Sequence, residues 1–104
     1  MLAPVTIEDC RLLHARSYVS AFRPVVLSFT NRRTTPATAI RIRVEYGGRT
    51  EEITDEGRFA ENVRIDHAFS GFYNATFSAA PPECSVREVE FADGSVWTAN
   101  DTKT

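Results

Sequence analysis

Apolar and polar side chains alternate along most of this chain with the two-residue period of a β-strand. The clearest run covers residues 40–46, where four apolar side chains alternate with three charged ones: Ile40, Ile42, Val44 and Tyr46, against Arg41, Arg43 and Glu45. A strand of this kind buries one face and exposes the other to water. No stretch keeps a helical period long enough to predict a helix. The pattern therefore predicts an all-β protein.

Two further strands follow from the same alternation. In residues 25–30, Val25, Leu27 and Phe29 are expected to share the buried face, with Pro24 at the first position of the strand. In residues 63–69 four side chains share a face, so that the histidine among them is expected to point inward: Val63, Ile65, His67 and Phe69. The polar segment over residues 31–36 predicts a loop.

Gly47-Gly48 predicts a two-residue hairpin turn, because both turn positions need a positive φ angle. This turn would set Ile42 opposite Ile53. Residues 49–54 would then form a polar edge strand, whose charges discourage pairing with another chain. The sequence of residues 55–58, Asp-Glu-Gly-Arg, predicts a second turn directly after this strand.

The segment around Asp93-Gly94 allows two hairpin turns. A two-residue turn would expose Trp97, the only tryptophan. A three-residue loop over residues 92–94, with Gly94 in the left-handed conformation and a bulge, pairs Val89 with Trp97 instead. We favour the three-residue loop because it gathers four apolar side chains on one buried face: Val89, Phe91, Trp97 and Ala99.

The length of 104 residues is typical of one domain. We expect a single sandwich domain over residues 1–99 and a polar tail over residues 100–104. A net charge of −2 provides no cationic surface, so nucleic-acid binding is not expected. No apolar run approaches the roughly 20 residues that span a bilayer, so the chain is not expected to cross a membrane.

Short strands, frequent turns and this length predict an immunoglobulin-like antiparallel β-sandwich of about seven strands. The chain resembles the immunoglobulin and fibronectin type III-like sandwiches in strand rhythm and size. Immunoglobulin domains have a tryptophan between their two cysteines and a tyrosine two residues before the second one. Here Trp97 follows both cysteines, and Pro82 stands two residues before Cys84. The resemblance therefore concerns the architecture alone. Three segments are also similar to small exported bacterial proteins of no assigned activity: Ser28-Phe29-Thr30-Asn31, Pro36-Ala37-Thr38 and residues 91–97.

Cys10 and Cys84 are the only cysteines and lie near opposite ends of the chain. If they pair, the disulfide closes a loop that contains most of the chain and stabilises the fold by roughly 4.5 kcal/mol in the chain-entropy model. The alternative is two buried, reduced thiols that pack as small apolar groups. A disulfide would require an oxidising compartment, so we expect a secreted or periplasmic protein, although the sequence begins without an export signal.

Residue types suited to catalysis or metal binding are present without a recognised motif. His14 and His67, together with the cysteines, supply metal-ligand chemistry, but their spacing lacks the paired ligands of a zinc site. Asp66 and His67 are the nearest acid–base pair, yet neighbours on a strand point to opposite faces. No Gly-x-Ser-x-Gly elbow is present. We expect no cofactor and no enzyme; the first alternative is a small metal-binding domain using His14 and His67, and the second is a hydrolase.

Two groups of side chains are candidate interaction patches. Phe72, Tyr73 and Phe77 lie in a glycine-containing segment that is too irregular for alternation to bury every ring. They either form an aromatic surface for a partner or close one end of the sandwich. Arg32 and Arg33 form a basic candidate for an anionic partner, which neighbouring glutamates would neutralise.

The sequence thus predicts a non-enzymatic binding or structural module whose ligand is a protein or a carbohydrate. This expectation depends on well-formed strands, on the two cysteines and on the lack of converging reactive side chains. The charged edge strand favours a monomer or a weak homodimer.

Overall fold

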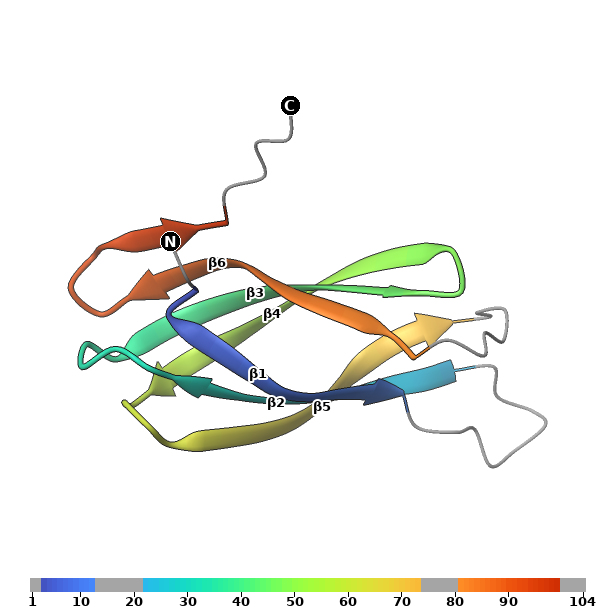
Figure 1. Ribbon diagram of the computed structural model, residues 1–104, viewed down its shortest axis with the longest axis horizontal. Coiled ribbons are helices and arrows are strands. Elements are labelled where there is room, and N and C mark those ends of the chain that lie inside the picture. Colours follow the sequence, from blue (N-terminus) through green and yellow to red (C-terminus); the bar gives the residue numbers. More distant parts are fainter. Residues whose placement is uncertain (1–2, 13–21, 74–80, 100–104) are drawn as a thin grey trace.

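The protein folds into two packed antiparallel sheets (Figure 1). A computed structural model describes residues 3–12, 22–73 and 81–99, with the backbone alone for residues 22–23 and 70–73. The described residues form these strands: β1 (Val5–Leu12), β2 (Phe22–Asn31), β3 (Ala37–Tyr46), β4 (Arg49–Phe59), β5 (Arg64–Tyr73), β6 (Glu83–Phe91) and β7 (Val96–Thr98). The strand order is β1-β2-β5 in the first sheet and β4-β3-β6-β7 in the second. The predicted all-β sandwich of about seven strands is confirmed.

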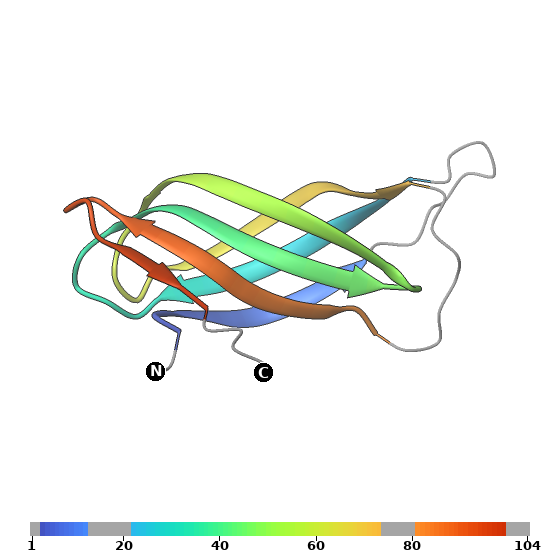
Figure 2. The same ribbon diagram turned by 90° about the horizontal axis from the view of Figure 1, so that it is seen from above.

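The core lies between the two sheets, whose strands cross at an angle in the turned view (Figure 2). Its fully buried side chains come mainly from the inner strands β2 and β3, including Leu27, Phe29, Ile40 and Val44. The Phe29 ring packs edge to face against Phe59 of β4, with centroids 5.3 Å apart and an interplanar angle of 85°. The alternation in residues 25–29 and 40–46 therefore identified the buried faces correctly.

β3 and β4 are joined by the predicted two-residue turn. Gly47 and Gly48 have φ angles of 57° and 78°, a region that residues with a side chain rarely adopt. The turn sets Ile42 opposite Ile53, as predicted. Both isoleucines are buried, so the turn and the core favour the same register.

β4 is longer than the sequence predicted. The turn expected over residues 55–58 is wrong, because the strand continues to Phe59. Phe59 is 4% exposed and packs in the core, which draws this part of the chain into the sandwich. Asp55 consequently falls on the same inner face as Ile53 and is itself buried.

The last hairpin has the predicted three-residue loop. Gly94 has a φ angle of 89°, and the Phe91 N–H donates to the Ser95 carbonyl at 2.9 Å. Val89 lies opposite Trp97, and Trp97 packs against the core. This register rules out the two-residue turn that would have exposed the tryptophan.

Other expectations need correction in position. Pro24 is the third residue of β2 rather than the first, and a register shift beside it accommodates its missing N–H. Val63 precedes β5 and is 49% exposed, because the chain is still turning at Asn62, where φ is 62°. Asn31 ends β2 and is fully buried rather than opening a polar loop. The expected tail over residues 100–104 lies outside the described residues.

Candidate functional site

Three connections between strands meet at one end of the sandwich (Figure 1). They are residues 32–36 between β2 and β3, residues 60–63 between β4 and β5, and residues 92–95 between β6 and β7. We call these three segments the loop end. Backbone hydrogen bonds of 2.7 to 2.9 Å tie the loop end together: Arg32 N–H to Pro4, Asn62 N–H to Asn31 and Ala92 N–H to Pro36.

Asn31 holds the loop end from beneath. Its side chain is fully buried, and its Nδ2 donates to the carbonyls of Thr35 and Phe59, each at 3.0 Å. Its Oδ1 accepts the N–H of Arg33 at 3.0 Å. A single buried amide therefore joins the 32–36 loop to the end of β4. Sequence analysis missed this residue, because a loop asparagine and a buried one look alike in a sequence.

Arg32 and Arg33, the predicted basic patch, both lie in the loop end but are held in different ways. Arg32 Nη2 pairs with Glu8 at 2.9 Å, and its Nε donates to Thr6 at 3.2 Å. The Arg33 guanidinium lies over the ring of Phe91, 4.7 Å from the centroid. Arg32 is thus neutralised by a carboxylate, whereas stacking on an aromatic ring fixes Arg33.

The neighbouring arginines of β3 are balanced by carboxylates. Arg41 Nε lies 3.6 Å from Glu88, and Arg43 Nη2 lies 3.5 Å from Glu52. These exposed pairs contribute little to stability, but they remove the positive charge that a wider basic patch would need. The basic candidate is therefore confined to the loop end.

Asp93 gives the loop end a fixed negative charge. Its Oδ1 accepts the Ser95 hydroxyl at 2.6 Å and the Ser95 N–H at 2.9 Å. These two hydrogen bonds are the main causes that lower the pKa of Asp93, and the charge of Arg33 adds to them. The loop end therefore presents ionised groups of both signs on a backbone that is fixed by hydrogen bonds.

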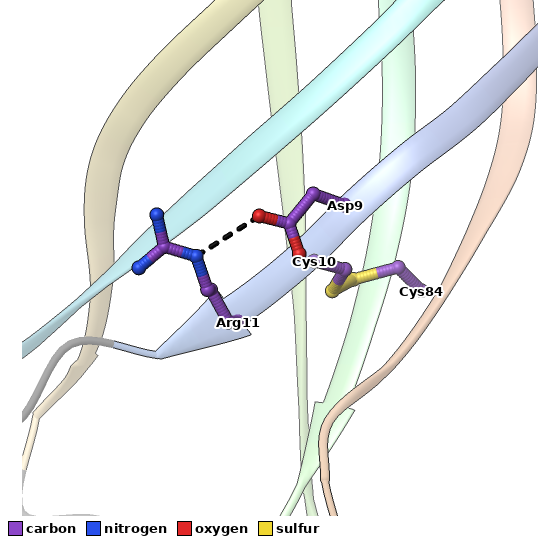
Figure 3. Close-up of a disulfide and its surroundings, with 4 residues drawn as sticks. All are labelled: Asp9, Cys10, Arg11 and Cys84. Atoms are coloured by element: carbon purple, nitrogen blue, oxygen red, sulfur yellow. Dashed lines mark hydrogen bonds and ion pairs between the residues drawn. A yellow bond between two sulfur atoms is a disulfide. The ribbon is translucent and has the colours of Figure 1, made fainter.

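Cys10 and Cys84 form a disulfide between the two sheets (Figure 3). Cys10 lies in β1, at the edge of the first sheet, and Cys84 lies in β6 of the second. Their Cα atoms are 6.3 Å apart, a distance that a disulfide spans. Asp9 and Arg11 lean toward one another on the other side of β1, with a contact of 2.9 Å. The bridge that the sequence suggested is present.

His67 and Asp55 meet on the opposite side of the sandwich. Nδ1 of His67 in β5 lies 2.6 Å from Oδ2 of Asp55 in β4. The Asp55 side chain is 9% exposed and that of His67 is 48% exposed. His67 thus faces the other sheet, as predicted, but it lies at the rim of the core. Sequence analysis missed Asp55 as its partner because it placed that residue in a turn.

Asp66 lies on the outer face of the first sheet. Its Oδ1 accepts hydrogen bonds from the Ser28 hydroxyl and from Arg64 Nε, which lies 3.0 Å away. The bond from Ser28, followed by that from Arg64, lowers the pKa of Asp66. The prediction that Asp66 and His67 point to opposite faces is confirmed.

The remaining predicted site residues lie wholly or partly outside the description. His14 and Phe77 are outside the described residues, and for Phe72 and Tyr73 of β5 only the backbone is described. Neither the aromatic patch nor a site that joins His14 to His67 is therefore placed. Within the described ranges, no three His, Cys, Asp or Glu side chains lie close enough together to hold a metal ion.

A shallow depression of about 370 Å³ lies at the β3–β4 turn. Its lining includes Glu45, Tyr46, Gly48, Arg49 and Glu83. Glu45 and Glu83 stand directly opposite each other on neighbouring strands. This depression is open and polar, unlike the enclosed, largely apolar pockets that hold most small molecules.

Comparison of the chain with protein families, with curated proteins and with solved structures finds no match. The part of the chain that the structure describes contains no helix with the length and hydrophobicity to span a membrane.

Proposed function

We propose that this protein is a non-enzymatic binding module of immunoglobulin-like architecture, which recognises a protein or a carbohydrate through the loop end. The strand order supports the immunoglobulin-like architecture. β4 follows β3 in the chain and pairs with it, in the sheet that also contains β6 and β7. Variable-type immunoglobulin domains likewise add the strand that follows their third strand to the sheet that contains the last two strands. Loops at one end of such a sandwich commonly carry recognition on a rigid scaffold.

The fixed loop end is the observation that carries this proposal. Asn31 and the backbone hydrogen bonds between the segments hold the loops before any partner arrives. Binding to a surface that is already ordered costs less conformational entropy than binding to mobile loops. Arg33 on Phe91 adds an arginine of fixed orientation, and arginine is enriched in binding interfaces.

The disulfide supports export. Disulfides persist in oxidising compartments, and the Cys10–Cys84 bridge fits such a location. A secreted or periplasmic binding module would meet its partner outside the cytoplasm.

Site-specific photo-crosslinking tests the proposal. A photo-reactive residue replaces Thr34 in the loop end, and a control variant carries it at Glu56, an exposed position of β4. Each variant is exposed to intact cells and envelope glycans of the source organism. We expect a discrete adduct from position 34 that Arg33→Ala weakens. Equal crosslinking from both positions, or adducts unaffected by Arg33→Ala, would contradict recognition through the loop end.

A further inference from the structure

β7 covers only part of the edge of β6. β6 has nine residues and β7 has three, which pair with residues 88–90 of β6. The last contact beyond the strand is the Ala99 N–H, which donates to the Arg87 carbonyl at 2.9 Å. Among the described strands, residues 83–86 of β6 therefore pair with β3 alone. One strand position in line with β7 is unfilled by any described strand.

The backbone groups that face this position follow from the side-chain pattern. Arg87 is an extra residue in β6 that shifts the register with β3, and on either side of this bulge the residues whose side chains share a face direct their N–H and C=O groups to the same edge. Phe91 faces the core, and its N–H donates to Ser95 on the β7 side. Cys84 and Val86 also face the core, since one forms the disulfide and the other is 8% exposed. Their peptide groups therefore face the unfilled strand position.

The side chains beside this position define what would fit there. On the outer face, the exposed Glu83 stands opposite Glu45, and like charges in this arrangement repel. Ser85 is the next exposed side chain on that face, and it stands opposite Arg43, whose charge is balanced by Glu52. On the inner face lie Cys84 and Val86. An added strand would therefore need apolar residues on one face and cationic residues on the other.

We propose that the edge of β6 over residues 83–86 accepts an extended segment of a partner protein in which apolar and basic residues alternate. The segment would continue the line of β7 and complete a strand along β6, with backbone hydrogen bonds to Cys84 and Val86. This is β-strand addition, in which the ladder provides affinity and alternate side chains provide specificity. The charge complementarity with Glu83 and Glu45 selects a basic segment.

The edge of β4 explains why β6 is the better acceptor. β4 is the other edge of the same sheet and carries charges of both signs at six of its eleven positions: Arg49, Glu51, Glu52, Asp55, Glu56 and Arg58. Dense charge of this kind blocks strand pairing. Residues 83–86 carry one charge, on Glu83, and it has the sign that a basic segment complements. The surface is separate from the loop end, so the two proposals stand or fall independently.

Amide exchange measured by NMR tests this proposal with an acetylated peptide of alternating lysine and valine. We expect amide exchange at Cys84 and Val86 to slow by about tenfold when the peptide is present. A peptide of the same sequence with N-methyl groups on alternate residues keeps its charge but cannot form the ladder, and it should give no protection. Glu83→Lys should weaken binding by about fivefold, whereas Glu56→Lys, at an exposed position of β4, should leave it unchanged.

Three outcomes would overturn the proposal. Equal binding of the N-methylated peptide would show that charge alone attracts it to the acidic face. Protection that grows with protein concentration and needs no peptide would show that a second copy of the chain fills the position. Binding that is seen only after removal of residues 100–104 would assign the position to the chain's own end. Thermal unfolding of the Glu83→Lys variant verifies that it is folded.

Discussion

The two long sides of the sandwich are closed by different chemistry. On one side β1 lies against β6, and the Cys10–Cys84 disulfide joins the sheets covalently. On the other side β4 lies against β5, and a hydrogen bond of 2.6 Å joins Asp55 to His67. A disulfide stabilises the fold mainly by restricting the unfolded chain, whatever surrounds it in the folded protein. The stability that a hydrogen bond contributes depends on its burial and on both partners being present. The first side is therefore expected to contribute more to stability than the second.

The two links also differ in whether they can be predicted from the sequence. Two cysteines in a chain of this length suggest a pair without any knowledge of the strands. Asp55 and His67 become partners only when β4 is known to continue past residue 54 and to lie beside β5. Links of the first kind are visible in a sequence, and links of the second kind need the topology.

Removal of the disulfide is expected to lower the stability of the protein more than any other change proposed here. The bridge closes a separation of 74 residues, and its loss through Cys10→Ala with Cys84→Ala should lower the free energy of unfolding by about 4.5 kcal/mol. Urea unfolding measures the change, with the wild type in reductant as a second form without the bridge. Intact mass should show the two-hydrogen deficit in the unreduced wild type. A loss below about 1 kcal/mol would mean that the β1–β6 side is held mainly by packing.

Removal of Asp55 tests the other side. Asp55→Ala deletes a buried carboxylate together with its hydrogen bond to His67, and it should cost about 1–2 kcal/mol because His67 remains half exposed to water. Glu56→Ala changes the next residue, which is exposed, and should cost less than about 0.5 kcal/mol. Equal effects of the two substitutions in urea unfolding would show that the Asp55–His67 hydrogen bond does not stabilise the β4–β5 side.

A double-mutant cycle measures the coupling between Asp55 and His67. His67→Ala leaves the buried Asp55 carboxylate without this hydrogen bond, whereas the double variant removes both polar groups. We expect the double variant to lose about 1 kcal/mol less than the sum of the two single variants. The effects of Asp55→Ala and of the cysteine substitutions should add, because they act on opposite sides of the sandwich. Additivity of Asp55→Ala with His67→Ala would show that the two residues act separately.

Most of the fold follows from local patterns in the sequence. The two-residue period identified the buried face of residues 40–46, and turn chemistry placed both hairpins at Gly47-Gly48 and at residues 92–94. The length of β4 does not follow locally. The Asp-Glu-Gly-Arg segment has turn composition, and the contact of Phe59 with Phe29 of the other sheet overrides it.

The candidate site could be predicted only in part. Arg32 and Arg33 are recognisable as candidates because two adjacent arginines are visible in a sequence. Which of them is neutralised by Glu8 and which stacks on Phe91 depends on tertiary contacts. Asn31 could not be separated from an ordinary loop asparagine, since its three side-chain hydrogen bonds reach the carbonyls of Thr35 and Phe59 and the Arg33 N–H. Residues that position a site through distant partners are therefore harder to predict than residues that display charge.

The smallest expected effect concerns an aspartate that joins strands of one sheet instead of linking the two sheets. A lowered pKa of Asp66 in the folded protein favours folding above the pKa of the unfolded chain, and this contribution is lost as pH falls through the folded value, below about pH 4. Ser28→Ala removes the largest cause and should raise the pKa of Asp66 toward its ordinary value. NMR titration of the carboxyl carbons measures the shift. Asp93 is the matched control, because its pKa is lowered by Ser95: Ser28→Ala should leave it unchanged, and Ser95→Ala should raise it alone. If Asp66 titrates identically with and without the Ser28 hydroxyl, the hydrogen bond from Ser28 in β2 to Asp66 in β5 is not what lowers the pKa of Asp66.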